Sequence, residues 1–281
     1  MDAVLSGVKG IVARNLISTR VYEQLGKQVS MLGLGHADVS NYRRHAYLEG
    51  IITDAYNGAA ITGDIWGAFE SIEGCCADAR FDSNEGGTVH CYIEKSGAER
   101  SSFEDRFSYV PPAPLPGRNI YELCPVYKAP PALGAQYAFD MDRGIIVDRK
   151  TAHRVVLVGV MTLANLFGEL EVELGEDIPR MIMAIEKDRI KEVILSKSKD
   201  LDPGEAGYLR YMKTLELKGM GNGTSVSASD GRLEVRVENP YFEPLIAGFL
   251  AGFYEATTGK DSAVEWTGAS SGHTDVTILP A

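Results

Sequence analysis

The amino-acid sequence predicts an α+β fold of two related lobes, each with helices packed on a small antiparallel sheet. Three observations lead to this prediction. Apolar residues recur at helical spacing, short alternating stretches indicate hairpins, and both halves contain a glycine-ended segment followed by a hairpin. A chain of 281 residues can form two small domains. We therefore place an N-terminal lobe at residues 1–150 and a C-terminal lobe at residues 151–281.

The composition is that of a globular protein, and it narrows the classes of partner. Hydrophobic residues make up 44% of the chain and charged residues 24%, with a net charge of −11. An acidic surface argues against nucleic acid and anionic membranes as main partners. No apolar run is long enough to span a bilayer, and the N-terminus lacks the pattern of a signal peptide. The four cysteines are irregularly spaced, so we expect a cytoplasmic protein without disulfides.

Helical spacing dominates the start of the chain. A helix is predicted within residues 1–35, and a second over 41–56, where Asn57 and Gly58 would end it. The apolar stripe of the first helix consists of Val21, Leu25, Val29 and Leu32. A short helical piece then carries Trp66 and Phe69, and alternation over 75–94 predicts a hairpin.

The middle of the chain contains a proline-rich connector followed by further predicted elements. The run Pro111–Gly117 cannot form a helix or a central strand. The next predicted elements are a strand-like apolar run at 120–126, a strand at 144–148, a buried helix at 155–170, amphipathic helices at 177–195 and 205–217, and a strand at 233–237.

The last predicted helix and hairpin organise the C-terminal lobe. The helix begins near Pro244 and ends at Gly259, which suits a left-handed C-cap, and the hairpin spans 263–279. Gly248 and Gly252 are poor helix residues that lie four apart on one face. We therefore expect another part of the protein to pack close to the backbone of this helix.

A short sequence echo suggests that the lobes are related. Tyr47-Leu-Glu-Gly50 resembles Phe249-Leu-Ala-Gly252, and a glycine and then a hairpin follow each of them. Chance is the alternative explanation, because glycine-ended helices before hairpins are common in α+β proteins. The prediction of two related lobes depends on this echo.

Residues 219–279 resemble the C-terminal part of a V4R (4-vinyl reductase) domain. That pattern has a glycine-bearing loop, a strand, a helix with two glycines and a glutamate, and a closing hairpin. The matching residues are Gly219, Gly223, Val235, Val237, Ala247, Gly248, Ala251, Gly252, Glu255, Gly259, Val264 and Val276. The resemblance implies a fold shared with TRAPP-type subunits and sensor domains, with a pocket for a small, largely apolar molecule. Many V4R domains carry cysteines in the final hairpin, where this chain has Trp266 and His273.

A second segment is similar to the 2-amino-thiazoline-4-carboxylate hydrolase-like proteins. The matching residues are Cys124-Pro-Val-Tyr127, Ala132-Leu-Gly134, Asp140-Met-Asp142 and Arg149. The terminal Cys-Asp-Phe of that pattern is missing, because Val156-Leu-Val-Gly159 stands in its place. Fold analogy alone does not establish a reaction.

The residues allow a cysteine-based catalytic site as one hypothesis. Cys124 would be the nucleophile, His153 the base and Asp140 the orienting group. The alternative is that Cys124 is an inert buried thiol. Asp140 and Asp142 could also hold a metal or act as an acid/base pair, or they could be solvated turn carboxylates. No metal-ligand spacing occurs among the histidines and cysteines, so we assign no metal ligands and no cofactor.

A ligand pocket lined by aromatic residues is the preferred hypothesis. The residues expected to line it are Trp66, Tyr127, Phe249, Gly252, Phe253 and Trp266, although any single aromatic residue could simply be core. The protein would then be a binding or sensor module for a small apolar, aromatic or heterocyclic compound, and it would signal through a partner or as a homodimer. The alternatives are a cysteine-dependent hydrolase acting on an amide or thiazoline-like ring, and a TRAPP-like structural subunit.

Overall fold

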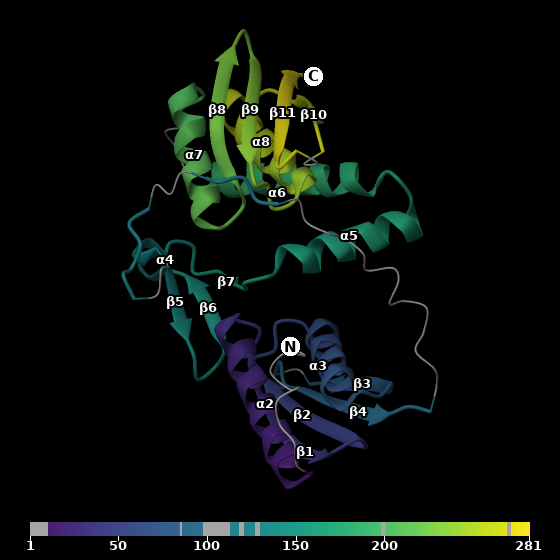
Figure 1. Ribbon diagram of the computed structural model, residues 1–281. Helices are drawn as coiled ribbons and strands as arrows, with labels where there is room; N and C mark the ends of the chain where they lie inside the picture. The colour runs from purple at the N-terminus through teal and green to yellow at the C-terminus, as the bar shows by residue number, and fades with distance from the viewer. Residues whose placement is uncertain are drawn as a thin grey trace. The chain divides into compact units, whose positions relative to one another are not determined.

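The computed structural model confirms the α+β fold, with helices packed on antiparallel sheets (Figure 1). The residues that the structure describes are 11–84, 86–97, 113–117, 121–126, 130–197, 201–268 and 271–281. They divide into two compact units. Unit 1 takes its residues from Met1–Glu104 and Leu123–Val158, and unit 2 from Asp105–Glu122 and Gly159–Ala281.

This division differs from the boundary after residue 150 that the sequence predicts, and local contacts explain the difference. Arg154 and Val155 pair with the preceding hairpin and therefore belong to unit 1. The proline-rich connector belongs to unit 2 through Leu115. Its backbone N–H donates to Oδ1 of Asn239 at 2.7 Å, and its carbonyl accepts from Nδ2 of the same side chain at 3.1 Å.

Unit 1 contains a four-stranded sheet with two helices on one face. Its first elements are α2 (Ile11–Met31), β1 (His36–Arg43), β2 (Tyr47–Thr53), α3 (Gly58–Glu73), β3 (Ala77–Ser83) and β4 (Val89–Lys95). The strands lie in the order β1-β2-β4-β3, and every neighbouring pair is antiparallel. A short helix and a three-stranded sheet complete the unit, namely α4 (Pro131–Gln136), β5 (Tyr137–Asp140), β6 (Ile145–Asp148) and β7 (Arg154–Val155).

The predicted helix over 41–56 is wrong, because this segment forms most of the β1–β2 hairpin. Leu48, Gly50 and Ile52 are buried at every second position, which is the period of a strand with one face in the core. Asn57 does not end a helix but begins one. Its side chain accepts a hydrogen bond from the backbone N–H of Ala60 at 2.9 Å and so caps α3.

Unit 2 contains a second four-stranded sheet with a more extensive helical layer. Its elements are α5 (Val160–Leu174), α6 (Ile178–Lys197), α7 (Glu205–Leu217), β8 (Asn222–Ser229), β9 (Arg232–Glu238), α8 (Glu243–Thr258), β10 (Ser262–Trp266) and β11 (His273–Pro280). The strands lie in the order β8-β9-β11-β10. The predicted helices over 177–195, 205–217 and 244–259 and the closing hairpin are confirmed.

One predicted helix of unit 2 differs in place and in burial. The expected buried helix over 155–170 begins at Val160 and ends at Leu174, because its first residues belong to β7 or lie outside any element. Only Ala164 of this helix is buried, and Leu166 and Val172 are 50% and 73% exposed. Its apolar composition therefore does not indicate a core helix.

The two units share one topology. Each contains, in chain order, a helix, a hairpin, a second helix and a second hairpin, and each sheet places its four strands in the same relative order. The first helices are α2 and α7, and the second are α3 and α8, both of 16 residues. The described structure therefore contains an internal repeat.

Backbone conformation supports the repeat at single-residue level. Six positions with left-handed φ angles in unit 1 have counterparts at corresponding places in unit 2. These pairs are Gly33 and Gly219, Gly35 and Gly221, His45 and Asp230, Asp54 and Asn239, Gly74 and Gly259, and Gly87 and Gly272. Two of the pairs contain no glycine, and residues other than glycine adopt this conformation rarely. Their recurrence is therefore a strong sign of common architecture.

The sequence echo that suggested related lobes matched the wrong segments. Tyr47–Gly50 lies in strand β2, whereas Phe249–Gly252 lies in helix α8. The true counterpart of α8 is α3, which carries the same glycine and glutamate spacing. The matched pairs are Gly63 and Gly248, Gly67 and Gly252, Glu70 and Glu255, and Gly74 and Gly259.

The paired glutamates make the same hydrogen bond. Oε1 of Glu70 accepts from the backbone N–H of Ala77, the first residue of β3, at 2.8 Å. Oε1 of Glu255 accepts from the backbone N–H of Ser262, the first residue of β10, at 3.0 Å. In both units, a carboxylate near the end of the second helix thus fixes the start of the hairpin that follows.

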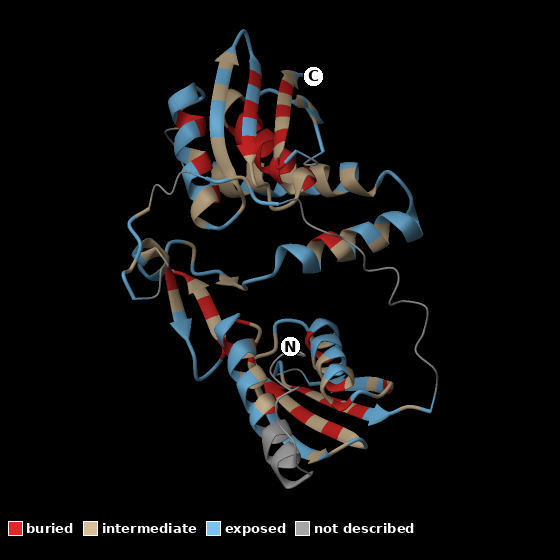
Figure 2. Cartoon of the chain, in the orientation of Figure 1, coloured by how far each residue is buried: buried red, intermediate tan, exposed pale blue. Residues whose placement is uncertain are grey.

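Helix α6 packs against the two glycines of α8, as their spacing predicted. A Cβ on Gly248 would lie 2.7 Å from the carbonyl oxygen of Met183, and one on Gly252 would lie 2.5 Å from that of Lys187. Figure 2 shows α8 as the most buried helix of unit 2. The same contact brings Nζ of Lys187 and Lys191 to within 2.9 and 2.8 Å of the carboxylate oxygens of Glu255, whose side chain is 1% exposed.

We expect Glu255→Gln to lower the free energy of unfolding by about 3 kcal/mol at pH 7, because it removes one partner of a buried charge network. Burial alone raises the pKa of Glu255, but hydrogen bonds from Lys191, Lys187 and Ser262 outweigh it and lower the pKa to about 2. Because the folded pKa is depressed, the stabilisation is present above the ordinary value of 4.5 and is lost as the pH falls towards 2.

Urea denaturation of the wild type and this variant at several pH values measures the effect. The gap in unfolding free energy should be widest near pH 7 and should narrow below pH 4.5. Glu265→Gln is the control, because Glu265 is exposed on β10 and should change stability by less than about 0.5 kcal/mol. Equal effects of the two substitutions would contradict the role of Glu255.

Gly252→Ala should destabilise the protein by about 1–3 kcal/mol, because the added methyl group meets the backbone of α6. Gly168→Ala in α5 is the matched control. A Cβ there has no described atom within 4 Å, so the higher helix propensity of alanine should stabilise that helix by up to about 1 kcal/mol. Thermal unfolding of both variants measures the difference, and a neutral Gly252→Ala would exclude tight α6–α8 packing.

Candidate functional site

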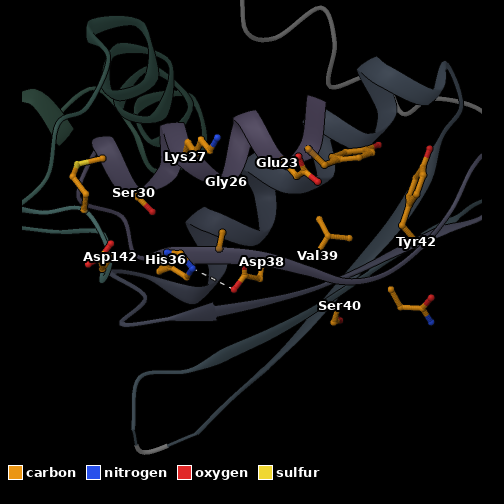
Figure 3. A pocket seen from close by; sticks show the side chains of 14 residues that line it. Glu23, Gly26, Lys27, Ser30, His36, Asp38, Val39, Ser40, Tyr42 and Asp142 are labelled. Atoms are coloured by element: carbon orange, nitrogen blue, oxygen red, sulfur yellow. Dashed lines mark ion pairs between the residues drawn. The ribbon is translucent and has the colours of Figure 1, made fainter. Parts of the chain in front are cut away.

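A groove of about 810 Å³ lies between helix α2 and strand β1 in unit 1 (Figure 3). Its lining residues are Tyr22, Glu23, Gly26, Lys27 and Ser30 from α2, His36, Ala37, Asp38, Val39, Ser40, Asn41 and Tyr42 from β1, and Met141 and Asp142 from the turn after β5. A helix, an edge strand and a turn thus form its walls.

The groove forms where α2 crosses the start of an edge strand. A Cβ on Gly26 would lie 2.6 Å from the carbonyl oxygen of Ala37, so glycine permits the close approach of helix and strand. Among the described strands, β1 pairs with β2 alone, and the register shifts between Val39 and Asn41. A bulge on an edge strand locally redirects side chains. The free edge of β1 therefore supplies one wall of the groove.

The turn between β5 and β6 is fixed against the residues on either side of the β1–β2 hairpin. The backbone N–H of Gly35 donates to the carbonyl of Gly144 at 3.0 Å. The guanidinium of Arg143 donates twice to the carboxylate of Asp54, at 3.0 and 2.7 Å, and this pairing lowers the pKa of Asp54 below its ordinary value. These contacts place Asp142 at the groove.

Charged side chains gather in the groove. Nε2 of His36 lies 3.2 Å from the carboxylate of Asp38, and Figure 3 shows this pair on the β1 side. Nδ1 of His36 is buried and has no hydrogen-bond partner among the described residues. Glu23 and Asp142 add two more carboxylates, and Lys27 adds one ammonium group. The groove therefore carries more negative than positive charge.

A buried carboxylate holds the two tyrosines of the groove. Glu73, the last residue of α3, accepts hydrogen bonds from the hydroxyl groups of Tyr42 at 2.7 Å and Tyr22 at 3.2 Å. It also accepts from the backbone N–H of His45 at 2.9 Å. Burial, and then the charge of Glu73, raises the pKa of Tyr22, so its hydroxyl remains a donor at neutral pH. The two ring centroids lie 5.2 Å apart with the planes tilted by 59°, so the core ring of Tyr22 backs the half-buried ring of Tyr42.

The three residues predicted to be catalytic share no hydrogen bond within the described structure. Cys124 is half-buried in residues 121–126, which form neither helix nor strand and so differ from the strand-like run expected there. Asp140 ends β5 and accepts the backbone N–H of Arg143 at 3.1 Å. His153 is exposed before β7. The geometry assembles no nucleophile, base and orienting group from these residues, so their catalytic roles stay predictions.

The residues predicted to line a ligand pocket do not line this groove. Trp66 lies in α3 of unit 1. Phe249, Gly252 and Phe253 lie in α8 of unit 2, and Trp266 lies in strand β10 of the same unit. Tyr127 lies outside the described residues. Phe249 and Phe253 belong to the hydrophobic core of unit 2, and the ring of Phe253 stacks on Tyr211 at 4.5 Å. The space beside Gly252 holds α6 rather than an open hollow.

Sequence reasoning missed the groove because it assigned residues 41–56 to a helix. That assignment hid the edge strand β1 and, with it, the pair formed by His36 and Asp38. A usable signal was present, since Gly33 and Gly35 break the preceding helix and alternation over β2 indicates a partner strand. The contribution of the distant turn at Asp142 has no local sequence signal.

Neither a multi-residue metal site nor a membrane-spanning helix occurs in the described parts of the chain. No three His, Cys, Asp or Glu side chains there are grouped so that they could hold a metal ion. No helix within the same ranges is both long and apolar enough to cross a membrane. The hypothesis that Asp140 and Asp142 bind a metal therefore gains no support from a third ligand among the described residues.

Comparison with known proteins leaves the family open. No protein-family model matches the chain, and no curated protein matches it significantly. Among solved structures, one described as "Probing the function of heme distortion in the H-NOX family" is 11% identical. The match covers 54% of this chain and 85% of that chain, with a TM-score of 0.33. A TM-score this low carries no argument about fold or function.

Tyr42→Phe should lower the free energy of unfolding by about 1–2 kcal/mol, because it removes a hydrogen bond to a buried charge. Tyr47→Phe is the control, since the Tyr47 hydroxyl donates to Asn41 at an exposed site and its loss should be nearly neutral. Urea denaturation measures both effects. If the two variants had equal stability, Glu73 would not organise this end of the groove.

Proposed function

We propose that the protein binds a small aromatic or heterocyclic molecule carrying a basic nitrogen in the groove between α2 and β1. The observation that carries the proposal is a groove of about 810 Å³ in which aromatic and charged side chains converge. Small-molecule sites commonly occupy about 300–1,000 Å³, so the groove has room for one such compound.

The lining supports the chemistry of the ligand. Tyr42 offers a half-buried ring held in place by Glu73 and backed by the core ring of Tyr22, which suits a flat aromatic body. Asp38 and Asp142 contribute carboxylates, which suit a protonated nitrogen. A purely apolar ligand would offer these carboxylates no hydrogen-bond donor, whereas a protonated nitrogen would.

A sensor or carrier role is the broader function that we infer from this site. The V4R resemblance of residues 219–279 implies a small-molecule pocket, although in the C-terminal part of the chain. The groove provides such a site in unit 1. A hydrolase role has no observation in its favour, because Cys124 does not line the groove and shares no hydrogen bond with His153 or Asp140.

Thermal shift and calorimetry with matched compounds test this function. Tryptamine and benzamidine should raise the melting temperature, because a ligand that binds only the folded state stabilises it. Their uncharged analogues, 3-methylindole and toluene, should have much smaller effects. The double variant Asp38→Asn/Asp142→Asn should weaken tryptamine binding about tenfold, which corresponds to about 1.4 kcal/mol.

The double variant Asp78→Asn/Asp82→Asn is the charge-matched control. Both residues are exposed on β3, the opposite edge strand of the same sheet, and their loss should leave the affinity unchanged. The proposal fails if the charged and uncharged compounds behave alike, or if the two double variants weaken binding equally.

A further inference from the structure

The repeat places two equivalent helices in different surroundings. In unit 2, every residue of α8 from Ile246 to Ala256 is buried, because the sheet covers one side of the helix and α6 covers the other. In unit 1, α3 has only four buried residues, which are Ile61, Thr62, Phe69 and Glu73. Figure 2 shows buried residues of α3 towards the sheet and exposed residues on its outer side.

The glycines that receive α6 in unit 2 are present but uncovered in unit 1. A Cβ on Gly63 or on Gly67 would have no described atom within 4 Å, whereas their counterparts Gly248 and Gly252 contact the backbone of α6. Glycine is unfavourable inside a helix, and no described atom of unit 1 lies close enough to require it at these positions. The pair is therefore suited to the close approach of another backbone.

The carboxylate beside these glycines also accepts fewer hydrogen bonds in unit 1 than in unit 2. In unit 2, Oε1 of Glu255 bonds to Ser262 and Lys187, and Oε2 bonds to Lys191. In unit 1, Oε1 of Glu70 bonds to Ala77 and Trp66, but no described residue donates to its Oε2. The oxygen that holds a lysine of α6 in unit 2 is thus without a donor in unit 1.

We propose that the outer face of α3, formed by Gly63, Gly67, Glu70 and the flanking Trp66, is a docking surface for a lysine-bearing amphipathic helix of a partner protein. The partner helix lies against the two glycines as α6 lies against α8. A lysine on it donates to Oε2 of Glu70. Trp66 is 39% exposed and fixed by hydrogen bonds to Ala77 and Glu70, so it can pack at the rim of the interface.

Charge complementarity favours a basic partner helix over a second copy of this chain. The charged residues of α3 are all acidic, as are those of α5, so pairing of α3 with α3 of a second copy, or with α5 of a second copy, would bring like charges together. By contrast, α6 carries Lys187 and Lys191 one turn apart, and these are the residues that meet Glu255. The surface includes no residue that lines the groove, so the inference does not depend on the proposed ligand.

Fluorescence anisotropy with a labelled peptide of the α6 sequence, residues 178–197, tests this surface on the full-length protein. The peptide should bind the wild type, and Gly67→Leu should weaken binding at least tenfold by blocking the approach of its backbone. Gly168→Leu is the matched control, because Gly168 is an exposed helical glycine of α5 with equal room for a side chain. This control should bind the peptide like the wild type.

A second peptide tests the charge pairing. Replacing both lysines by glutamate (Lys187→Glu/Lys191→Glu) should abolish binding to the wild type. Urea denaturation should show that Gly67→Leu remains folded, because a side chain at this position meets no described atom. If the α6 peptide does not bind, or if Gly67→Leu binds it normally, the proposal is overturned.

Sedimentation velocity separates the proposed occupant from a second copy of this chain. Under the proposal, wild type and Gly67→Leu sediment alike in the absence of peptide. A wild-type dimer that becomes monomeric in Gly67→Leu would show that the surface is used for self-association, and it would overturn the assignment to a basic partner helix.

Discussion

In each unit, one carboxylate links the end of a helix to the start of the next strand. Glu70 and Glu255 stand four residues before the left-handed glycines that end α3 and α8, and each accepts the N–H of the first residue of the following hairpin. The helix dipole disfavours negative charge at this end. Lys187 and Lys191 offset that penalty in unit 2. The linkage fixes the first residue of each hairpin against the end of the helix that precedes it.

Elements with strong local signals could be predicted from the sequence, and those decided by distant contacts could not. The period of α7 and the capping glycine of α8 are local features, so both were predicted correctly. The hairpin β1–β2 was missed because Tyr47–Thr53 contains apolar residues at spacings that also fit a helix, and burial against Phe69 decides in favour of a strand. The groove was missed because the helix assigned to residues 41–56 hid the edge strand β1. Its walls come from residues far apart in the sequence.

The repeat also shows how one helix–strand contact can be packed differently in the two copies. At corresponding places before the paired loop glycines, α2 has Gly26 and α7 has Met212. Met212 is buried and packs against Gly223, whereas Gly26 approaches Ala37 and leaves the edge of β1 accessible. Unit 1 thus has two small residues at this contact, whereas unit 2 has a large helical side chain against a glycine. A site can thus arise without any change in topology.

The shared glycine-and-glutamate face of α3 and α8 has a consequence for the ancestry of the chain. An ancestor made of one such repeat would have exposed this face to solvent, so it would have needed a companion chain to shield it. In the described structure, α6 is such a companion for the α8 face, and the glycines of α3 have none. Selection could then tie the second copy to an outside protein, whose arrival and departure would leave the sheet beneath it undisturbed.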